Sequence, residues 1–337
     1  MIEGIIWAII AGIMLGTYAL PEKFTKDFAF ENTWGLMFTL NMFLIPIISA
    51  ALLIKGFGGV LSGIPTDILL KMAIASVMWG IGAMMWGKAI NYIGLSLGFS
   101  IFIGTVILVG SLLPFLVDGL PPSNVLVYIL VGIAIVLVGV IVNGKAGMVR
   151  ESDEKSDSTT EKVSMTKGIV IAVVGGLLAT GFSFANAVGR PYLHEACQAT
   201  GNPEWVTSVA VMFVIYVCGG LVVTPYFIVK LTQQGLWKNF KTPHLGKNTL
   251  LILVMAILNF AASATFAYAA FKLGKAGNTV GYAIFNTICV AVAIVGGLLT
   301  REWVKASGKA RLYLYIGLAC MIIGVVIIAL GNSQGVL

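Results

Sequence analysis

Ten long apolar stretches, separated by short polar connections, follow one another along the chain. A helix needs about 20 mainly apolar residues to span the hydrocarbon core of a bilayer, whereas transmembrane strands would show short alternating segments. The pattern therefore predicts an all-α integral membrane protein with ten transmembrane helices. These helices are expected at roughly residues 4–21, 34–54, 68–88, 92–117, 124–143, 168–189, 205–229, 249–271, 278–299 and 312–331.

A hydrophilic segment between the fifth and sixth stretches divides the chain of 337 residues into two halves. Its run of Glu, Asp, Lys, Ser and Thr is typical of a solvated linker. We predict a first five-helix repeat at residues 1–143, a cytoplasmic linker at 144–167 and a second five-helix repeat at 168–337.

Two segments of the first half recur in the second half, in the same order. Gly4–Gly12 matches Gly168–Gly176 at an offset of 164 residues, and Ser96–Phe102 matches Thr279–Phe285 at an offset of 183. Because five is an odd number, the second repeat enters the membrane from the opposite face. The matches therefore predict inverted repeats, an architecture typical of secondary transporters that bind their substrate near the midplane.

Composition and charge support a membrane protein and set its orientation. The chain is 58% hydrophobic and only 10% charged, with a net charge of +7, which disfavours a soluble enzyme and a nucleic-acid-binding domain. Sixteen of the 21 Lys and Arg residues fall in the connections after odd-numbered helices. The positive-inside rule places these connections in the cytoplasm and both termini on the opposite side.

Motifs for enzymatic chemistry are absent from the sequence. No Gly-Lys pair is followed by Ser or Thr as in a Walker A motif, and no Gly-x-Ser-x-Gly elbow or metal-binding histidine pair occurs. We therefore expect no enzymatic activity, no direct use of ATP, no cofactor and no metal.

Polar side chains inside predicted spans are candidates for substrate binding, because burying them in a membrane is costly. Asn carries both a donor and an acceptor, which suits a neutral hydroxylated substrate. Hydrogen bonding between helices is the alternative role. The candidates are Asn41, Asn186, Asn259 and Asn286.

Aromatic side chains accompany these asparagines and would stack on the apolar faces of a sugar ring. Anchoring at the membrane interface is the alternative role of Trp and Tyr, and we assign Trp34, Trp205 and Trp303 to it. The substrate-binding candidates of this kind are Tyr18, Trp79, Trp86 and Tyr268.

Ionisable residues near the ends of the first helix of each half are candidates for proton coupling. Glu22 and Glu31 follow the first helix, and the 164-residue offset pairs Glu31 with Glu195, which His194 precedes. A carboxylate near a base can change its protonation when the structure opens or closes. The alternative is a salt bridge that orients a helix end.

Several segments resemble the bacterial L-rhamnose–proton symporters of the drug/metabolite transporter superfamily. The resemblance spans the chain in order, and it implies two inverted five-helix repeats in the bacterial inner membrane, periplasmic termini, and uptake of a deoxy-sugar with protons. It also favours His194 and Glu195 as functional residues. The segments are Met78-Trp-Gly-Ile-Gly82, Gly94-Leu-Ser-Leu-Gly98, Gly104-Thr-Val-Ile-Leu-Val-Gly-Ser-Leu-Leu-Pro114, Lys167-Gly168, Gly181-Phe-Ser-Phe-Ala185, Arg190-Pro-x-x-His-Glu-Ala196 and Arg301-Glu-Trp303.

Two places depart from the pattern expected of that family. The segment Ala261-Ala-Ser-Ala-Thr-Phe-Ala267 is small and weakly polar, and Asn278 stands where an acidic residue is expected.

The main hypothesis is a proton-driven importer of a small neutral sugar, with the sugar, protons and the lipid bilayer as its partners and no nucleic acid. A metabolite or drug exporter or exchanger of the same superfamily, and a membrane sensor or scaffold, are the alternatives. Glycine-rich helix faces leave a homodimer open.

Overall fold

The chain forms an all-helical bundle in the computed structural model, which describes residues 2–93, 95–113, 115–154, 165–274, 277–299, 303–304 and 306–334. Within these residues no β-strand occurs. The first half comprises α1 (Ile2–Thr17), η1 (Leu20–Phe24), α2 (Phe30–Thr39), η2 (Leu40–Leu44), α3 (Ile45–Leu53), α4 (Phe57–Ser62), α5 (Thr66–Ile93), α6 (Leu95–Leu112), α7 (Phe115–Asp118) and α8 (Ser123–Glu154). The second half comprises α9 (Met165–Ala179), α10 (Gly181–Ala199), α11 (Val206–Gln233), η3 (Leu236–Lys241), α12 (Leu245–Lys272), η5 (Gly277–Gly281), α13 (Tyr282–Leu299) and α14 (Gly308–Gln334).

Nine helices of the described chain are long and apolar enough to cross a membrane. They cover nine of the ten predicted spans. The region of the predicted fourth span contributes Ile101–Leu112, a shorter apolar helix that belongs to α6. The sequence places a proline at position 114, which lacks the amide hydrogen that a continuing helix needs, and α6 ends two residues before it.

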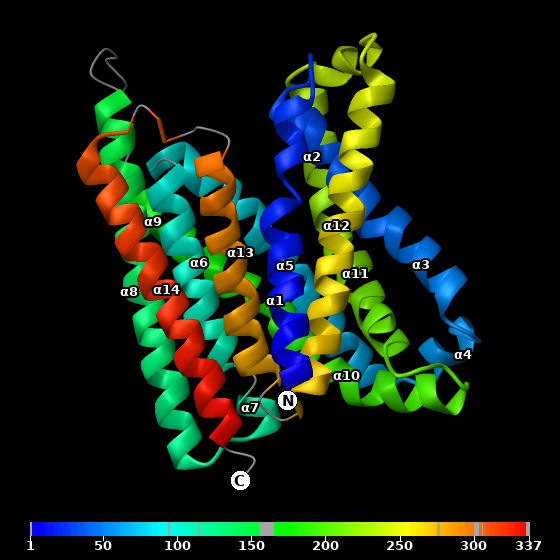
Figure 1. Cartoon of the computed structure of the whole chain (residues 1–337). Coiled ribbons are helices and arrows are strands. Elements are labelled where there is room, and N and C mark those ends of the chain that lie inside the picture. The colour runs from blue at the N-terminus through cyan, green and yellow to red at the C-terminus, as the bar shows by residue number, and fades with distance from the viewer. Residues whose placement is uncertain are drawn as a thin grey trace.

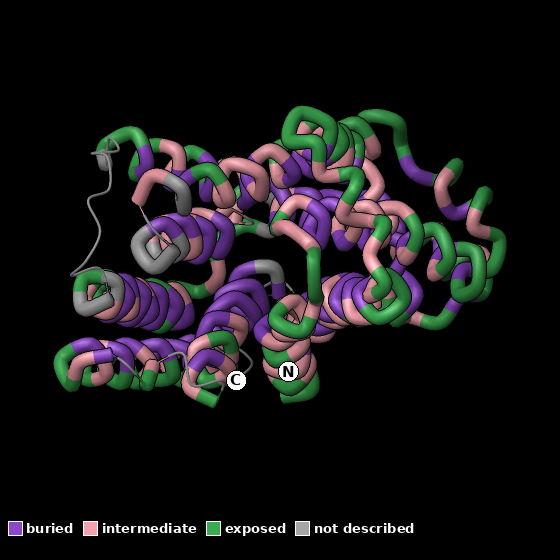
Figure 2. The backbone as a smooth tube through the Cα atoms, turned by 90° about the horizontal axis from the view of Figure 1, so that it is seen from above, coloured by how far each residue is buried: buried purple, intermediate pink, exposed green. Residues whose placement is uncertain are grey.

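The helices stand side by side, and both termini lie at the same end of the bundle (Figure 1). Figure 2 shows buried backbone in the interior and exposed backbone around the outline. Large apolar side chains cover much of that outline, such as Leu52 at 78% and Ile141 at 68% exposure. An apolar exterior of this extent is typical of a protein surrounded by lipid.

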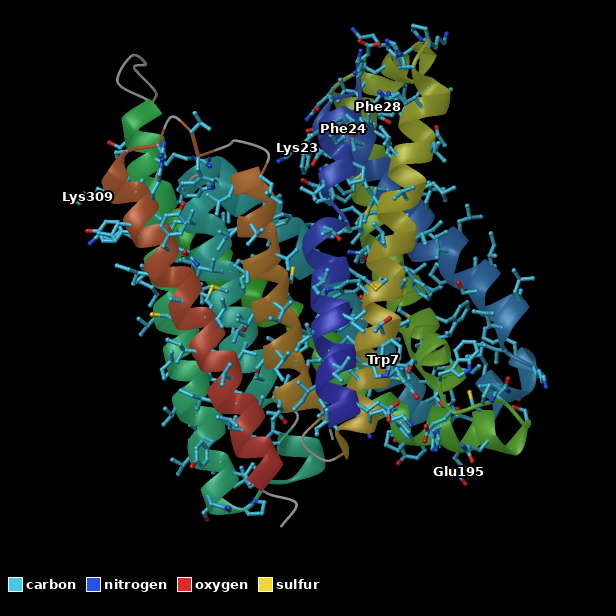
Figure 3. The ribbon with its side chains drawn as sticks, in the orientation of Figure 1. Trp7, Lys23, Phe24, Phe28, Glu195 and Lys309 are labelled. Atoms are coloured by element: carbon cyan, nitrogen blue, oxygen red, sulfur yellow. The ribbon has the colours of Figure 1, made fainter. Side chains whose placement is uncertain are left out.

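Lysines from two of the connections that follow odd-numbered helices lie at the end of the bundle opposite the termini. Figure 3 labels Lys23, from the connection after the first span, and Lys309, from the start of α14, at the upper end of the bundle. Glu195 is labelled at the lower end, near both termini. The predicted linker at 144–167 is helical at both ends, because α8 continues to Glu154 and α9 begins at Met165. Residues 155–164 of that linker lie outside the described residues.

Two spans are interrupted near the middle of their length. The second span changes from α2 through a π-helical turn, η2, to α3. Pro46 follows this turn, and a proline ring clashes with the carbonyl four residues before it, which here belongs to Met42. The sixth span breaks at Thr180, between α9 and α10. Interrupted helices of this kind surround the binding sites of many transporters.

Glycines at sequence-matched positions make matching close contacts. A Cβ atom on Gly12 of α1 would lie 2.9 Å from the carbonyl oxygen of Phe285 in α13. A Cβ atom on Gly176 of α9 would also lie 2.9 Å from the carbonyl oxygen of Phe102 in α6. The offset of 164 residues relates the two glycines, and the offset of 183 relates the two phenylalanines. Both glycines therefore let one helix cross another at backbone distance.

The helices α8 and α14, which pack against each other at the edge of the bundle, also use glycine at their contact. A Cβ atom on Gly132 would lie 2.8 Å from the carbonyl oxygen of Gly324, and one on Gly139 would lie 2.7 Å from that of Gly317. These four glycines are therefore occupied by packing within the chain, so they offer no free face for a homodimer.

Gly176→Leu is expected to lower the melting temperature of the protein in detergent, because the carbonyl of Phe102 belongs to the backbone and cannot move aside like a side chain. Overpacking of this kind typically costs about 1–3 kcal/mol. Gly87→Leu in α5 is the matched control, since a Cβ on Gly87 meets no described atom within 4 Å. Equal melting temperatures of the two variants would contradict the close crossing.

Candidate functional site

A cluster of uncharged polar side chains lies between the second, seventh and eighth spans. The Asn41 side-chain amide in η2 donates a hydrogen bond of 2.7 Å to Oδ1 of Asn259 in α12. The Tyr216 hydroxyl of α11 donates to the same oxygen at 2.9 Å and lies 2.5 Å from Oγ of Ser263. We call these four residues the central polar cluster. The sequence predicted two of them, Asn41 and Asn259, and the structure brings these two into direct contact.

Three of the four residues of the central polar cluster are buried, and one buried acceptor has no described partner. Asn41 is fully buried, and Tyr216 and Ser263 are 1% and 3% exposed. Oδ1 of Asn41 has no hydrogen-bond partner among the residues that the structure describes. Buried polar atoms are nearly always hydrogen-bonded, and an exception calls for an explanation such as a ligand. A ligand hydroxyl is the kind of donor that this oxygen requires.

Aromatic rings surround the polar cluster on several sides. The ring of Trp79 in α5 lies 5.2 Å from that of Tyr216 and 5.4 Å from that of Phe182, measured between centroids. The Phe260 ring packs edge-on against Tyr216 at 5.2 Å, and Phe266 lies 5.9 Å from Phe182. Trp79, which the sequence predicted, therefore stands at the cluster. The arrangement combines hydrogen-bonding groups with flat apolar surfaces.

Glu22 lies on the side of this site that faces away from the termini. Oε1 of Glu22 accepts a hydrogen bond of 2.7 Å from the indole of Trp34. The Tyr18 ring packs edge-on against Trp34 at 6.0 Å, and Tyr18 lies within electrostatic range of both Glu22 and Tyr216. A series of contacts therefore runs from the Glu22 carboxyl through the Trp34 indole to the Tyr18 ring.

The assignment of Trp34 to the membrane interface is wrong. Trp34 is 4% exposed and lies in the main hydrophobic core. Its indole nitrogen needs a partner once it is buried, and the Glu22 carboxyl supplies one. Glu22 lies in η1 and Trp34 lies in α2, 12 residues further along the chain, so the sequence alone did not indicate that they pair.

The other proton-coupling candidates lie apart from Glu22. His194 of α10 is half-buried, with Nδ1 3.1 Å from the Thr207 hydroxyl and its ring 4.7 Å from that of Phe271. Glu195 is exposed at the end of the bundle near the termini. Glu31 is half-buried in the first turn of α2. The structure therefore does not gather the four candidates into one site.

The remaining predicted residues have separate surroundings. Asn186 is fully buried in α10. The amide of Asn286 donates to the carbonyl of Tyr282 at 2.9 Å, within its own helix. The Trp86 ring lies 6.3 Å from that of Phe102. The contacts of Asn286 and Trp86 are compatible with a packing role.

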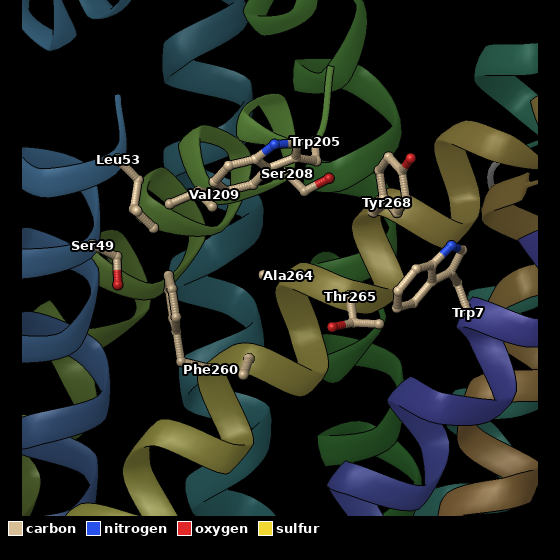
Figure 4. A pocket seen from close by; sticks show the side chains of 11 residues that line it. Trp7, Ser49, Leu53, Trp205, Ser208, Val209, Phe260, Ala264, Thr265 and Tyr268 are labelled. Carbon is tan, nitrogen blue, oxygen red and sulfur yellow. The ribbon is translucent and has the colours of Figure 1, made fainter. Parts of the chain in front are cut away.

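Tyr268 lines a separate pocket of about 490 Å³ between α1, α3, α11 and α12. Figure 4 shows the aromatic and hydroxyl side chains that surround this space. Trp7 lies near the start of α1 and Trp205 directly precedes α11, so the pocket is in the half of the bundle near the termini. We call it the termini-side pocket.

Comparison with known proteins identifies the family. The family model of the L-rhamnose-proton symport protein (RhaT) matches residues 1–334. The chain belongs to this family. The chain is 26% identical to the L-rhamnose-proton symporter of Escherichia coli (strain 55989 / EAEC) over 344 residues, which cover 98% of both chains. It is also 26% identical to that of Cronobacter sakazakii (strain ATCC BAA-894) over 343 residues, 98% of this chain and 97% of the relative.

Membership in the RhaT family makes the chain a membrane transport protein and not an enzyme. The resemblance noted in the sequence is therefore confirmed at the level of this family.

Sequence reasoning missed Tyr216, Ser263 and Phe182 as parts of the site. The available signal was the position of Tyr216, which lies eleven residues into α11 and not at a membrane interface, where Tyr is expected.

Proposed function

We propose that this chain imports a small neutral sugar of the L-rhamnose type together with protons, by alternating access across the bacterial inner membrane. In this proposal the chain belongs to the drug/metabolite transporter superfamily. It has ten transmembrane helices in two inverted repeats, a cytoplasmic linker at 144–167 and periplasmic termini. The naming of its relatives as L-rhamnose-proton symporters supports the substrate and the coupling ion.

The glycine crossings support the inverted repeat. Beside the matching contacts of Gly12 and Gly176 with backbone oxygens, the next contact also agrees. A Cβ on Gly12 would lie 2.7 Å from Cβ of Ile288, and one on Gly176 would lie 2.7 Å from Cβ of Thr105. The offset of 183 residues relates Thr105 to Ile288. The first span thus meets the ninth as the sixth meets the fourth, which is the relation expected of two halves that pack against each other with two-fold symmetry.

The free acceptor of Asn41 carries the proposal for the sugar site. A deoxy-sugar presents several hydroxyl groups, C–H faces and a methyl group, and it carries no charge. The central polar cluster offers amide and hydroxyl groups at Asn41, Asn259, Tyr216 and Ser263, and the ring of Trp79 borders it. Aromatic faces and uncharged hydrogen-bonding groups match both parts of such a molecule.

Glu22 is the group that we assign to proton coupling. A carboxyl group binds and releases a proton, and the Glu22 carboxyl is connected through the Trp34 indole to the Tyr18 ring. Sugar binding that moves Tyr18 or Trp34 would alter the hydrogen bond that Glu22 accepts, and so change its proton affinity. Glu31, His194 and Glu195 remain further candidates, and the same transport assay ranks them.

Purified protein in proteoliposomes is expected to accumulate labelled L-rhamnose when the proton gradient is directed inward. One pH unit supplies about 1.4 kcal/mol per proton, which supports about tenfold accumulation. A protonophore should abolish the accumulation while leaving exchange of labelled for unlabelled sugar. Accumulation that persists with the protonophore would refute proton coupling, and the lack of any sugar exchange would refute the sugar substrate.

A further inference from the structure

The termini-side pocket has the chemistry of a second binding site. Its lining carries three serine and threonine hydroxyl groups, on Ser49, Ser208 and Thr265, besides the phenol of Tyr268. No hydrogen bond joins these three hydroxyls to another residue of the chain as the structure describes it. Ser and Thr hydroxyls in helices commonly bond to the carbonyl four residues before them. Hydroxyls that instead face a pocket are available to a ligand.

Aromatic rings form the walls of the same pocket. Trp7, Trp205, Phe260 and Tyr268 line it, and the ring of Trp7 meets that of Tyr268 edge-on at 5.8 Å. An acyl chain would be matched by aliphatic side chains, and it would leave the three hydroxyls without partners at a cost in free energy. Rings together with uncharged hydroxyls suit a molecule that has both C–H faces and hydroxyl groups.

The floor of the pocket is formed by residues of the segment 261–267, whose small side chains depart from the pattern expected of the family. Ala261 and Ala264 lie on the face of α12 toward the pocket, and Thr265 lies beside them. Larger side chains at these positions would fill the space. The small residues at 261–267 therefore create room on this helix face.

Charge near the pocket favours a neutral ligand. None of the lining residues is charged. At the edge, Lys272 lies 2.6 Å from the Glu204 carboxylate and 4.0 Å from that of Glu3, and its ammonium stands 5.3 Å from the Tyr268 ring centroid. Two carboxylates already neutralise this lysine, so it offers no strong attraction to an anionic ligand.

The inner wall of the pocket is shared with the central polar cluster. Phe260 lines the pocket, and its ring packs at 5.2 Å against Tyr216, which bonds Asn259 and Ser263. The Phe260 ring therefore contacts both the termini-side pocket and the central polar cluster. A ligand in the termini-side pocket lies next to the proposed sugar site, on the side of the termini.

We propose that the termini-side pocket is an outer binding site for a neutral monosaccharide, occupied before the sugar passes Phe260 to reach the central polar cluster. This inference rests on the proposed sugar transport. The rings of Trp7 and Trp205 receive the apolar face of the sugar, and the hydroxyls of Ser49, Ser208 and Thr265 pair with its hydroxyl groups. The outer site is expected to bind weakly, with a Kd of about 1 mM or above, because its three hydroxyls come from three different helices.

The test measures sugar binding in nanodiscs of defined phospholipid, by the change in tryptophan emission during titration with L-rhamnose. Asn259→Leu serves as the background, since it removes the central site. We expect a saturable change in this background that disappears after the further change Ala264→Leu, which fills the pocket. Val254→Leu is the matched control, because Val254 is 39% exposed on the same helix and does not line the pocket.

A second pair of substitutions, made together, distinguishes a bound sugar from a bound lipid chain. Ser208→Ala with Thr265→Val keeps the shape of the pocket and removes two hydroxyls, so it should weaken a sugar at least tenfold and leave an acyl chain unaffected. Unchanged sugar titration in this pair overturns the proposal. Loss of a retained phospholipid in Ala264→Leu, seen by native mass spectrometry without any effect on the sugar titration, assigns the pocket to lipid and also overturns it.

Uptake by the wild-type protein distinguishes this inference from the proposed function. If the wild type accumulates L-rhamnose and the Asn259→Leu protein shows no saturable response, the outer site is refuted while the transport function stands. If the wild type neither accumulates nor exchanges the sugar, the proposed function itself has failed. A folded, wild-type-like elution profile of each variant in size-exclusion chromatography is required for both comparisons.

Discussion

Replacing Asn259 with leucine is expected to abolish sugar uptake and to lower sugar affinity by about 100-fold or more, the scale on which sites that hydrogen-bond a substrate hydroxyl respond when a partner is lost. Leucine has nearly the same shape, so the change removes polarity with little change in volume. Oδ1 of Asn259 accepts hydrogen bonds from both Asn41 and Tyr216. Its loss frees both donors at once and disorganises the central polar cluster.

The measurement is equilibrium binding of labelled L-rhamnose together with initial uptake in proteoliposomes. Asn143→Leu is the matched control: Asn143 is also half-buried in a span and its Oδ1 also lacks a described hydrogen-bond partner, but it lies away from the central polar cluster and donates to the sulfur of Met321 in the α8–α14 pair. That variant should keep wild-type uptake. Uptake by Asn259→Leu within about twofold of the wild type would remove the central polar cluster from the sugar site, since a lost buried hydrogen bond costs about 1–3 kcal/mol.

Changing Glu22 to glutamine is expected to eliminate accumulation against a gradient while leaving exchange of sugar across the membrane. The glutamine amide oxygen can still accept the hydrogen bond from Trp34, so the local structure is kept. The amide cannot bind and release a proton in the physiological range. The variant should bring inside and outside sugar concentrations to equality, where the wild type reaches about tenfold per proton at one pH unit.

Parallel variants identify the coupling group. Glu3→Gln is the matched control, because Glu3 has a carboxylate that is 57% exposed at the opposite end of the bundle, and it should accumulate sugar normally. Glu31→Gln, His194→Gln and Glu195→Gln are measured under the same gradient. If Glu22→Gln accumulates sugar like the wild type and one of these three does not, the coupling role moves to that residue.

Sequence patterning predicted the helical class and most of the spans because apolar length is a direct property of the chain. It located Asn41 and Asn259 because an amide within an apolar run stands out. It did not locate Phe182, whose importance comes from its ring contacts with Trp79 and Phe266, since phenylalanine within a span carries no polar signal. Trp34 was misplaced because its nearness to a span end indicated the interface, whereas its partner Glu22 came from a preceding helical turn.

The extent of the linker was also hidden from the sequence. The predicted linker began at residue 144, yet α8 continues to Glu154. Hydropathy marks where a helix leaves the bilayer, and helix propensity determines where it ends, so a charged segment can extend a transmembrane helix into water.

The matched glycine crossings have a mechanical consequence. In a carrier whose two halves exchange conformations, as we propose for this chain, the crossing at Gly12 in one state would adopt the geometry that the crossing at Gly176 has in the other. The distances to the two carbonyl oxygens are equal in this structure, so neither crossing would change between the states. The two crossings would then be fixed contacts about which the halves rock, and a side chain added at either glycine would destabilise both states without shifting the population between them.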